Sequence, residues 1–258
     1  MAGMPSFLPV LTFHDIDDHP SVTTVSPGVF KQGMAKLYSN GYRTLCQMEV
    51  VDILKRGALF PDRYFGITFD DGYRSVYTEA FSILQLYGMS ATVFLTVGDG
   101  ITLKPNDRLP SINGLSMLNW NEIREMQRWG IEFGAHTCTH PDLTNIPFDR
   151  VKKEVYESKA IIEDALNTPV YCFAYPYGRY NHRVRNIVRE HFSCACSDKL
   201  GLINKKSDPY AFERVDAYYL RTDRLFQIML NRLFPWYVLA RSIPRNIRRA
   251  LRPSSGKR

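Results

Sequence analysis

The chain has 258 residues, of which 45% are hydrophobic and 23% charged, and this composition excludes a disordered, collagen-like or small disulfide-rich protein. Its formal net charge of +7 arises from residues 237–258, which contain seven basic residues and no acidic residue. The first 236 residues carry 26 basic and 26 acidic side chains. The body is therefore neutral, and the composition does not favour nucleic-acid binding.

Seven apolar, β-branched or aromatic runs predict buried strands, and six segments between or after them have helical periodicity. The strands are expected at residues 7–13 (FLPVLTF), 64–69 (YFGITF), 91–97 (ATVFLTV), 131–135 (IEFGA), 170–175 (VYCFAY), 192–197 (FSCACS) and 211–220 (AFERVDAYYL). The helices are expected at residues 26–41, 75–88, 119–130, 148–166, 182–192 and 222–234. Apolar strands that alternate with helices are typical of a parallel sheet covered on both faces. We therefore predict an α/β fold, a βα barrel, with an open doubly wound sheet as the alternative.

One domain is expected over residues 1–236, followed by a basic, partly apolar tail over residues 237–258, because no repeat or flexible linker interrupts the body. No run of about 18 uncharged apolar residues predicts a membrane-spanning helix, and the first residues lack the features of a signal peptide. The five cysteines are odd in number and form no CxxC pair, which is typical of a reducing compartment. These features predict a soluble, cytoplasmic protein.

Polar residues follow four of the predicted strands, and the carboxyl ends of parallel strands are where α/β proteins place functional groups. They are His14 and Asp15 after the first strand, Asp70 and Asp71 after the second, His136 and His140 after the fourth, and the turn Pro176-Tyr177-Gly178 after the fifth. Two histidines separated by three residues, together with one carboxylate, form a ligand set of catalytic zinc that leaves a position for water. The sequence therefore predicts one divalent metal ion, for which zinc fits the ligands best.

Water bound to such an ion loses its proton near neutral pH and becomes a nucleophile. One member of the Asp70 and Asp71 pair can bind the ion while the other accepts the proton of the water, and the spacing leaves open which does which. The turn Pro176-Tyr177-Gly178 can direct a backbone N–H toward the oxyanion of a tetrahedral intermediate. Together these groups predict a metal-dependent hydrolase.

The segments ITFDDGY (residues 67–73), GAHTCTHPDLT (134–144) and FAYPYGRYN (173–181) resemble the motifs of the polysaccharide deacetylase family, also called the NodB-homology family of carbohydrate esterases. The resemblance covers roughly residues 8–216. It implies a distorted (β/α)7 barrel and metal-dependent hydrolysis of an N-acyl group, usually the acetamide of an N-acetylhexosamine. By position, it implies Asp70 as the general base, Asp71, His136 and His140 as the metal ligands, and the Tyr177 N–H as an oxyanion donor.

Two positions depart from the family pattern. Many members carry an arginine in the third motif that orients the base, whereas this chain has Ala174, and many carry a late histidine as general acid, whereas no histidine follows His191. We expect Arg214, in the seventh strand, to pair with Asp70 and keep it ionised. The alternative is that Arg214 forms an ion pair at the rim without a catalytic role.

His14 is expected to act as the acid or to contact the sugar, with a structural hydrogen-bonding role as the alternative. Tyr175, Pro176 and Asp216 are expected to contact the substrate, and Asp216 shares a strand face with Arg214 because side chains alternate with a period of two.

The resemblance therefore implies an enzyme that removes an N-acyl group, usually N-acetyl, from an amino sugar in a glycan or in a lipid-linked glycan intermediate. The alternatives are a deformylase or amidase that acts on a lipid-linked or small amide, and a carbohydrate-binding homologue without turnover. In the tail, aromatic and aliphatic residues adjoin arginines, a pattern that favours peripheral contact with the inner face of a membrane. A docked helix followed by a soluble tail is the alternative.

Overall fold

The computed structural model describes residues 7–19, 21–98, 104, 106–231 and 233–250, and seven strands close into a parallel barrel. These strands are β1 (Val10–Phe13), β5 (Tyr64–Phe69), β6 (Thr92–Leu95), β7 (Glu132–Ala135), β8 (Cys172–Ala174), β9 (Cys194–Leu200) and β10 (Phe212–Asp216). The ring closes because β1 pairs with β10 on one side and with β5 on the other, so that Leu11 lies opposite both Val215 and Ile67. The predicted barrel is confirmed, and the open-sheet alternative is wrong because an open sheet leaves two edges unpaired.

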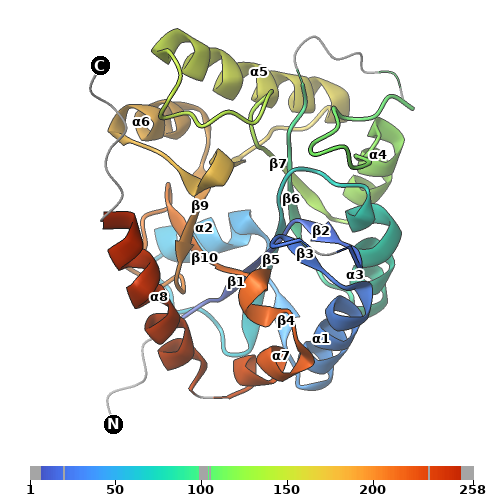
Figure 1. Cartoon of the computed structure of the whole chain (residues 1–258), viewed down its shortest axis with the longest axis vertical. Coiled ribbons are helices and arrows are strands. Elements are labelled where there is room, and N and C mark those ends of the chain that lie inside the picture. Colours follow the sequence, from blue (N-terminus) through green and yellow to red (C-terminus); the bar gives the residue numbers. More distant parts are fainter. Residues whose placement is uncertain (1–6, 20, 99–103, 105, 232, 251–258) are drawn as a thin grey trace.

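Helices connect the strands and surround the barrel (Figure 1). They are α1 (Pro27–Ser39), α2 (Gln47–Lys55), α3 (Phe81–Tyr87), α4 (Trp120–Arg128), α5 (Phe148–Leu166), α6 (His182–His191), α7 (Asp223–Met229) and α8 (Phe234–Ala250). A π-helical turn η1 (Val76–Ala80) leads into α3, and short 3-10 turns η2 (Pro176–Gly178) and η3 (Ala217–Leu220) follow β8 and β10. Residues 201–211 are all described and contain no helix, so the alternation of strands and helices is incomplete between β9 and β10.

Four short elements were not expected from the sequence. They are α2, the paired two-residue strands β2 (Asp15–Ile16) and β3 (Thr24–Val25), and β4 (Arg43–Thr44), which pairs with the start of β5. Two residues carry no detectable periodicity, so such strands are defined only by the partner that the tertiary fold brings to them. The β2 and β3 pair follows β1 and therefore lies beside the residues expected to function.

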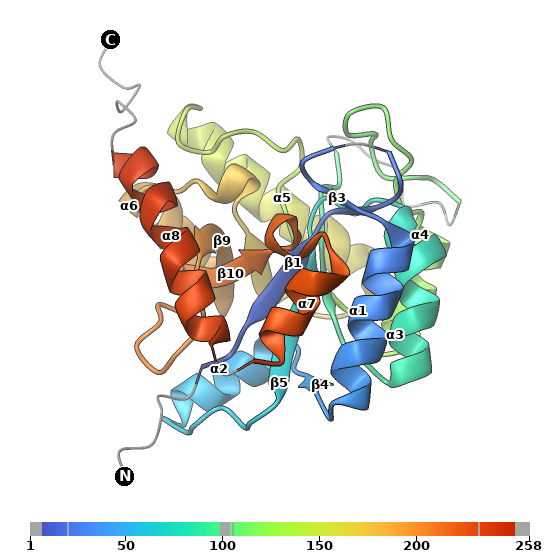
Figure 2. The ribbon, with the colours of Figure 1, turned by 60° about the horizontal axis from the view of Figure 1, so that its bottom comes forward.

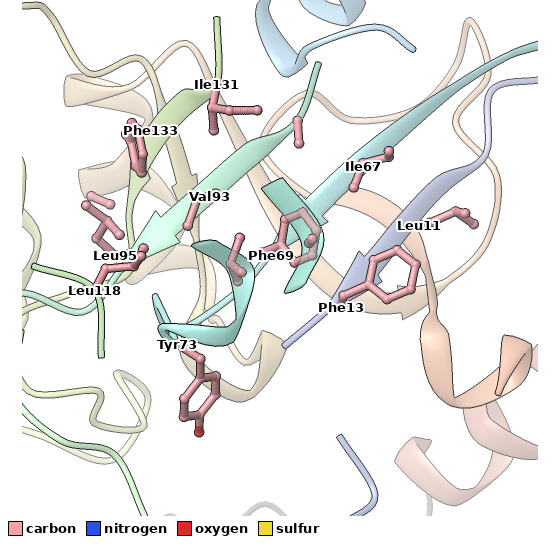
Figure 3. Packing of buried hydrophobic residues seen from close by; sticks show 14 of the residues in the cluster. Leu11, Phe13, Ile67, Phe69, Tyr73, Val93, Leu95, Leu118, Ile131 and Phe133 are labelled. Carbon is pink, nitrogen blue, oxygen red and sulfur yellow. The ribbon is translucent and has the colours of Figure 1, made fainter. Parts of the chain in front are cut away.

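The core between the barrel and its helices is aromatic where β1, β5 and α1 meet. The rings of Phe13 and Phe69, on adjacent strands, have centroids 5.6 Å apart, and Phe30 of α1 packs edge-on against Phe13 at 5.1 Å. Figure 3 shows Leu11 and Phe13 beside Ile67 and Phe69 on the two strands. Aromatic contacts of this kind contribute beyond their buried area, so they fix β1 against β5 and place the ends of the two strands together.

The expected boundary between residues 236 and 237 falls inside helix α8. Phe234, Val238 and Ser242, each four residues apart, are buried, and α8 packs against β9 and α7. The first part of the expected tail is therefore a helix docked on the barrel (Figure 2). The expected basic residues Arg252, Lys257 and Arg258 lie outside the described residues. Within the described ranges, no helix is both long enough and apolar enough to cross a membrane.

Candidate active site

Alternate side chains of the strands point into the barrel, because successive strand residues face opposite sides. Hydrogen bonds inside the barrel identify the inward set. Thr12 and Thr68 share a hydrogen bond of 3.0 Å between their hydroxyl oxygens, and the Thr92 hydroxyl donates to Glu132 at 2.6 Å. All of these residues have even numbers, so the inward rows of β1, β5 and β7 continue to His14, Asp70 and His136. Period-two alternation thus delivers three of the expected site residues to one mouth of the barrel.

Asp71 breaks this alternation and yet faces the same mouth. Its φ angle is +73°, in the left-handed region that residues other than glycine rarely adopt. The backbone thereby turns at Asp71, so that the carboxylates of both adjacent aspartates reach the site. Residues held in such conformations cost roughly 1–3 kcal/mol each and cluster at functional sites.

Asp71, His136 and His140 bring three potential ligand atoms into a nearly equilateral triangle. The two Nε2 atoms of His136 and His140 are 3.2 Å apart, and Asp71 Oδ1 lies 3.4 Å from the first and 3.3 Å from the second. A tetrahedron with edges of this length has its centre about 2.0 Å from each corner, which is the usual distance from zinc to imidazole nitrogen or carboxylate oxygen. Asp71 Oδ1 is also buried without a hydrogen-bond partner. The three residues therefore fit a divalent ion.

The hydrogen bonds and charges around the triangle suit a cation. His136 Nδ1 lies 2.7 Å from the carbonyl oxygen of Ala174, which can only accept, so the proton is on Nδ1 and the Nε2 lone pair faces Asp71 and His140. Burial, followed by the charge of His136, lowers the pKa of His140 to about 4, which keeps this ring neutral near pH 7. Burial alone would lower the pKa of His136, but Asp71 and Asp70 outweigh it and raise that pKa. Two carboxylates at the site therefore attract positive charge.

The loop that carries the two histidines is fixed by Glu154, a residue that the sequence analysis did not identify. Glu154 lies on the buried face of α5, and its carboxylate accepts the backbone N–H groups of Cys138 and Thr139, both at 2.9 Å, as well as the Thr139 hydroxyl. Thr137 and His140 have φ angles of +72° and +55°, so the loop is strained as well as anchored. A detectable signal was present, since Glu154 interrupts the apolar stripe of a predicted helix.

Asp70 is held by Arg214 in a buried, two-fold hydrogen bond. Both guanidinium NH groups of Arg214 donate to the two carboxylate oxygens of Asp70, each at 2.8 Å, and both side chains are about 5% exposed or less. Burial alone would raise the pKa of Asp70, but the charge and hydrogen bonds of Arg214 outweigh it and lower that pKa well below its ordinary range. Arg214 also donates from Nε to the carbonyl oxygen of Ser197 at 2.9 Å. The expected pairing of Arg214 with Asp70 is therefore present in the structure, and a rim ion pair does not describe a buried contact.

His14 lies on the open side of Asp70. Its Nε2 atom is 3.9 Å from Asp70 Oδ2, and its side chain is 21% exposed, compared with 5% for Asp70. The histidine can therefore meet a ligand that enters from solvent, as a proton donor or a sugar contact requires.

Tyr177 lies on the other side of the triangle, in the turn after β8. Its φ angle is +57°, its ring centroid is 4.7 Å from that of His140, and its side chain is 56% exposed. The next residue must be glycine, because a Cβ at Gly178, where φ is +61°, would lie 2.3 Å from Asp198 atoms. Glycine at position 178 thus allows the turn after β8 to pack against Asp198 while the Tyr177 backbone lies at the mouth.

Two expected substrate contacts are not compatible with the structure. Tyr175 is 1% exposed and its hydroxyl donates to the carbonyl oxygen of Tyr210 at 3.1 Å, while Pro176 is also buried. We therefore assign Tyr175 and Pro176 to packing, because a sugar ring cannot reach them. Asp216 is half-buried at the end of β10, where it accepts the backbone N–H of Tyr218 at 2.8 Å. It caps η3 and keeps a position at the mouth.

Comparisons with known proteins agree with this geometry. The family model described as polysaccharide deacetylase matches residues 59–192. The YxkH protein of Bacillus subtilis is 28% identical over 212 residues, covering 82% of this chain and 71% of that protein. The poly-beta-1,6-N-acetyl-D-glucosamine N-deacetylase of Staphylococcus aureus is 29% identical over 201 residues, which cover 73% of this chain and 60% of that enzyme.

Two solved structures share the fold over most of the chain. The deacetylase PplD of Streptococcus pyogenes, in complex with acetate, is 26% identical with a TM-score of 0.72, covering 83% of this chain and 93% of that one. IcaB of Ammonifex degensii is 25% identical with a TM-score of 0.71, covering 86% of this chain and 97% of that one. The family model and these relatives identify the chain as a hydrolase. The chain belongs to the polysaccharide deacetylase family, and it is a hydrolytic deacetylase.

Proposed function

We propose that the protein is a metal-dependent enzyme that removes the N-acetyl group from an N-acetylhexosamine unit of a glycan. The observation that carries this proposal is the triangle of Asp71, His136 and His140 beside an aspartate that Arg214 keeps ionised. The similar Staphylococcus aureus enzyme, named for its action on poly-N-acetylglucosamine, supports an amino-sugar substrate.

Asp71, His136 and His140 would hold the ion, which zinc suits best among first-row metals given one carboxylate and two imidazoles. When bound, the ion supplies positive charge that polarises the acyl carbonyl and acidifies water. The identity of the metal is thus part of the proposal.

The residues of the chain then divide the proton transfers. Asp70 takes one proton from water as the water oxygen attacks the acetyl carbonyl carbon, and the Tyr177 backbone N–H donates to the developing oxyanion. His14 gives a proton to the amide nitrogen as the C–N bond breaks, which releases acetate and a free amino sugar. Arg214 touches neither reactant and acts through Asp70, so it is a positioning residue.

The position of Arg214 also bears on the alternative of a carbohydrate-binding homologue without turnover. That alternative was motivated by Ala174 and by the absence of a late histidine. Arg214 contacts Asp70 from β10, and His14 lies near Asp70 at the end of β1. Asp70 therefore has partners even though the arginine of the third motif and the late histidine are missing. We therefore favour an active enzyme.

The test combines metal content and acid release. The wild-type protein is purified with Asp70→Asn, His136→Ala and the control His182→Ala, which removes an exposed histidine of α6. Bound metals are quantified, and acetate and formate are measured after incubation with N-acylated glycans and lipid-linked amino sugars. We expect about one ion per chain and acetate release in wild type and the control, metal without release in Asp70→Asn, and neither in His136→Ala.

Two results would overturn the proposal. Metal binding by His136→Ala at the wild-type level would show that the metal site is assigned to the wrong residues. Metal binding without acid release from any substrate of the panel would favour a binding protein. Release of formate in place of acetate would identify the deformylase alternative.

A cytoplasmic location stays a prediction. The five cysteines all lie within the described residues and form no disulfide, although the sulfur atoms of Cys172 and Cys194 are 3.4 Å apart, which is compatible with a reducing compartment. Fractionation of cells that make the protein tests it.

A further inference from the structure

Helix α8 has two apolar stripes on opposite sides. Phe234 and Val238 form the inner stripe with exposed fractions of 5% and 3%, and they pack toward the barrel. Trp236, Leu239 and Ile243 form the outer stripe, with exposed fractions of 68%, 51% and 51%. Their spacing of three and four residues places the three side chains on one face of the helix. A docked surface helix needs only the inner stripe, so the outer stripe calls for a separate explanation.

The surroundings of the outer stripe are basic. Residues 233–258 contain seven lysines and arginines and no acidic residue, whereas the first 236 residues are neutral. Arg241 is also exposed on α8, but it lies on another side of the helix than the stripe, with its guanidinium 5.6 Å from the ring centroid of Tyr237. Leu233, 62% exposed, continues the apolar surface at the start of the helix. Apolar exposure and unbalanced positive charge therefore coincide in one segment.

We propose that the outer stripe of α8 (Trp236, Leu239 and Ile243) docks the protein on the surface of a bilayer that contains anionic lipid. Amphipathic helices that bind in this way bury tryptophan and aliphatic side chains at the headgroup boundary, while basic residues meet the anionic headgroups. A nucleic acid or another polyanion would use the charges but would leave the apolar stripe exposed. The combination of both features selects the lipid surface.

The helix orientation gives this docking a consequence for the enzyme. The carboxyl end of α8 lies toward the same end of the molecule as the carboxyl ends of the strands (Figure 2). A protein docked through α8 therefore lies with the side of its barrel along the bilayer, so that the mouth opens beside the membrane surface and not away from it. The docking itself rests on α8 alone and does not require the proposed reaction.

The test is co-sedimentation of the full chain with vesicles of phosphatidylcholine alone or of an equal mixture with phosphatidylglycerol. We compare wild type with the triple variant Trp236→Ser, Leu239→Ser and Ile243→Ser. The matched control Leu86→Ser and Trp129→Ser removes one exposed apolar side chain of α3 and one that directly follows α4, with exposed fractions of 68% and 65%. Thermal unfolding and acetate release from a soluble glycan check that each variant is folded and active.

We expect wild type and the control to bind the mixed vesicles at low salt. The affinity of the triple variant for these vesicles should be lower by about tenfold or by a larger factor. Arg241→Gln should weaken binding to the mixed vesicles by a smaller factor. The proposal is overturned if wild type does not bind, or if the triple variant binds as well as wild type, since charge alone then explains the adsorption. It is also overturned if the triple variant converts a dimer to a monomer in light scattering without a change in vesicle binding, because the stripe would then join two copies.

Discussion

The mouth and the base of the barrel are built on different principles. The base of the lumen is filled mostly by apolar or sulfur-containing side chains, such as Val10, Phe94, Cys172 and Phe212, all with 0% exposure, around the hydrogen-bonded pair of Thr92 and Glu132. The mouth holds four residues with positive φ that are not glycine, namely Asp71, Thr137, His140 and Tyr177. Close packing at the base of the barrel thus stabilises the fold. The strained residues at the mouth lower the free energy of unfolding, but they hold the charged and metal-binding side chains in place.

Removal of a proposed metal-binding side chain or of the metal ion at the mouth should abolish activity without unfolding the protein. We predict that His136→Ala, or chelation of the wild-type protein, lowers acetate release about a thousandfold or more, because several kcal/mol of transition-state stabilisation depend on the metal site. Added zinc should restore the chelated wild type and leave the variant inactive. Kinetics with metal analysis and circular dichroism make the comparison. Loss of the native circular dichroism spectrum in His136→Ala would show that the mouth also contributes to the stability of the fold, contrary to this comparison.

Arg214 lies where the two regions meet, so its removal should affect both activity and stability. Arg214→Gln leaves the buried charge of Asp70 without its partner, and we expect a loss of about 3–5 kcal/mol in unfolding free energy together with a fall in kcat of about a hundredfold. KM should change little, because Arg214 acts through Asp70.

The double variant Asp70→Asn with Arg214→Gln provides the control. It removes both charges, so it should recover much of the stability lost in Arg214→Gln while remaining inactive. Urea unfolding of the four proteins gives the coupling energy. A destabilisation of the double variant equal to the sum of those of Asp70→Asn and Arg214→Gln would mean that the two side chains are not coupled.

A substitution at the base of the barrel should lower stability while leaving activity unchanged, which is the opposite of the effect expected at the mouth. We predict that Phe212→Leu, which shortens a fully buried side chain of β10, costs about 1–2 kcal/mol of unfolding free energy. Metal content and kcat at a temperature well below unfolding should stay close to wild type. If the metal content of Phe212→Leu fell along with its unfolding free energy, the geometry of the mouth would depend on close packing at the base of the barrel.

The smallest effect is expected at Glu132, a buried carboxyl at the start of β7. Burial, only partly offset by the hydrogen bond from Thr92, raises the pKa of Glu132 above that of an unfolded chain. A raised pKa favours folding below the unfolded value, and this contribution is lost as pH rises through the folded value. Unfolding free energies of wild type and Glu132→Gln, compared at pH 4 and pH 7, should therefore shift in favour of the variant at the higher pH. A constant difference would contradict the raised pKa.

The sequence was informative wherever local pattern determines structure. The barrel strands are rich in apolar residues, so all seven were found, although the seventh ends at Asp216 and not at residue 220. Polar residues collect at strand ends, so the sequence also predicted the side chains of Asp71, His136 and His140 that the structure brings together. The two-fold contact between Asp70 and Arg214 joins residues 144 positions apart. Its existence was expected, but its geometry depends on a register shift between β9 and β10 that no local pattern encodes.

Burial of single polar or aromatic residues was harder to predict. Tyr175 follows a strand, as a functional residue would, but Tyr180 stacks on its ring and its hydroxyl donates a hydrogen bond to the backbone carbonyl oxygen of Tyr210. Both partners come from loops whose paths are set by tertiary packing. The same limit applies to Asp71, because adjacent aspartates are expected to point apart until the φ angle of the second is known.

The closure of the ring by β1 and β10 has a consequence for how the protein is made. Asp70, the proposed general base, and His136 and His140, the proposed metal ligands, are synthesised well before Arg214, which comes from the last strand of the barrel. On the ribosome, a nascent chain that has not yet emerged to β10 lacks the counter-charge that holds Asp70. Catalytic competence therefore arrives in one step, when the first and last strands meet, and an unfinished chain is chemically silent.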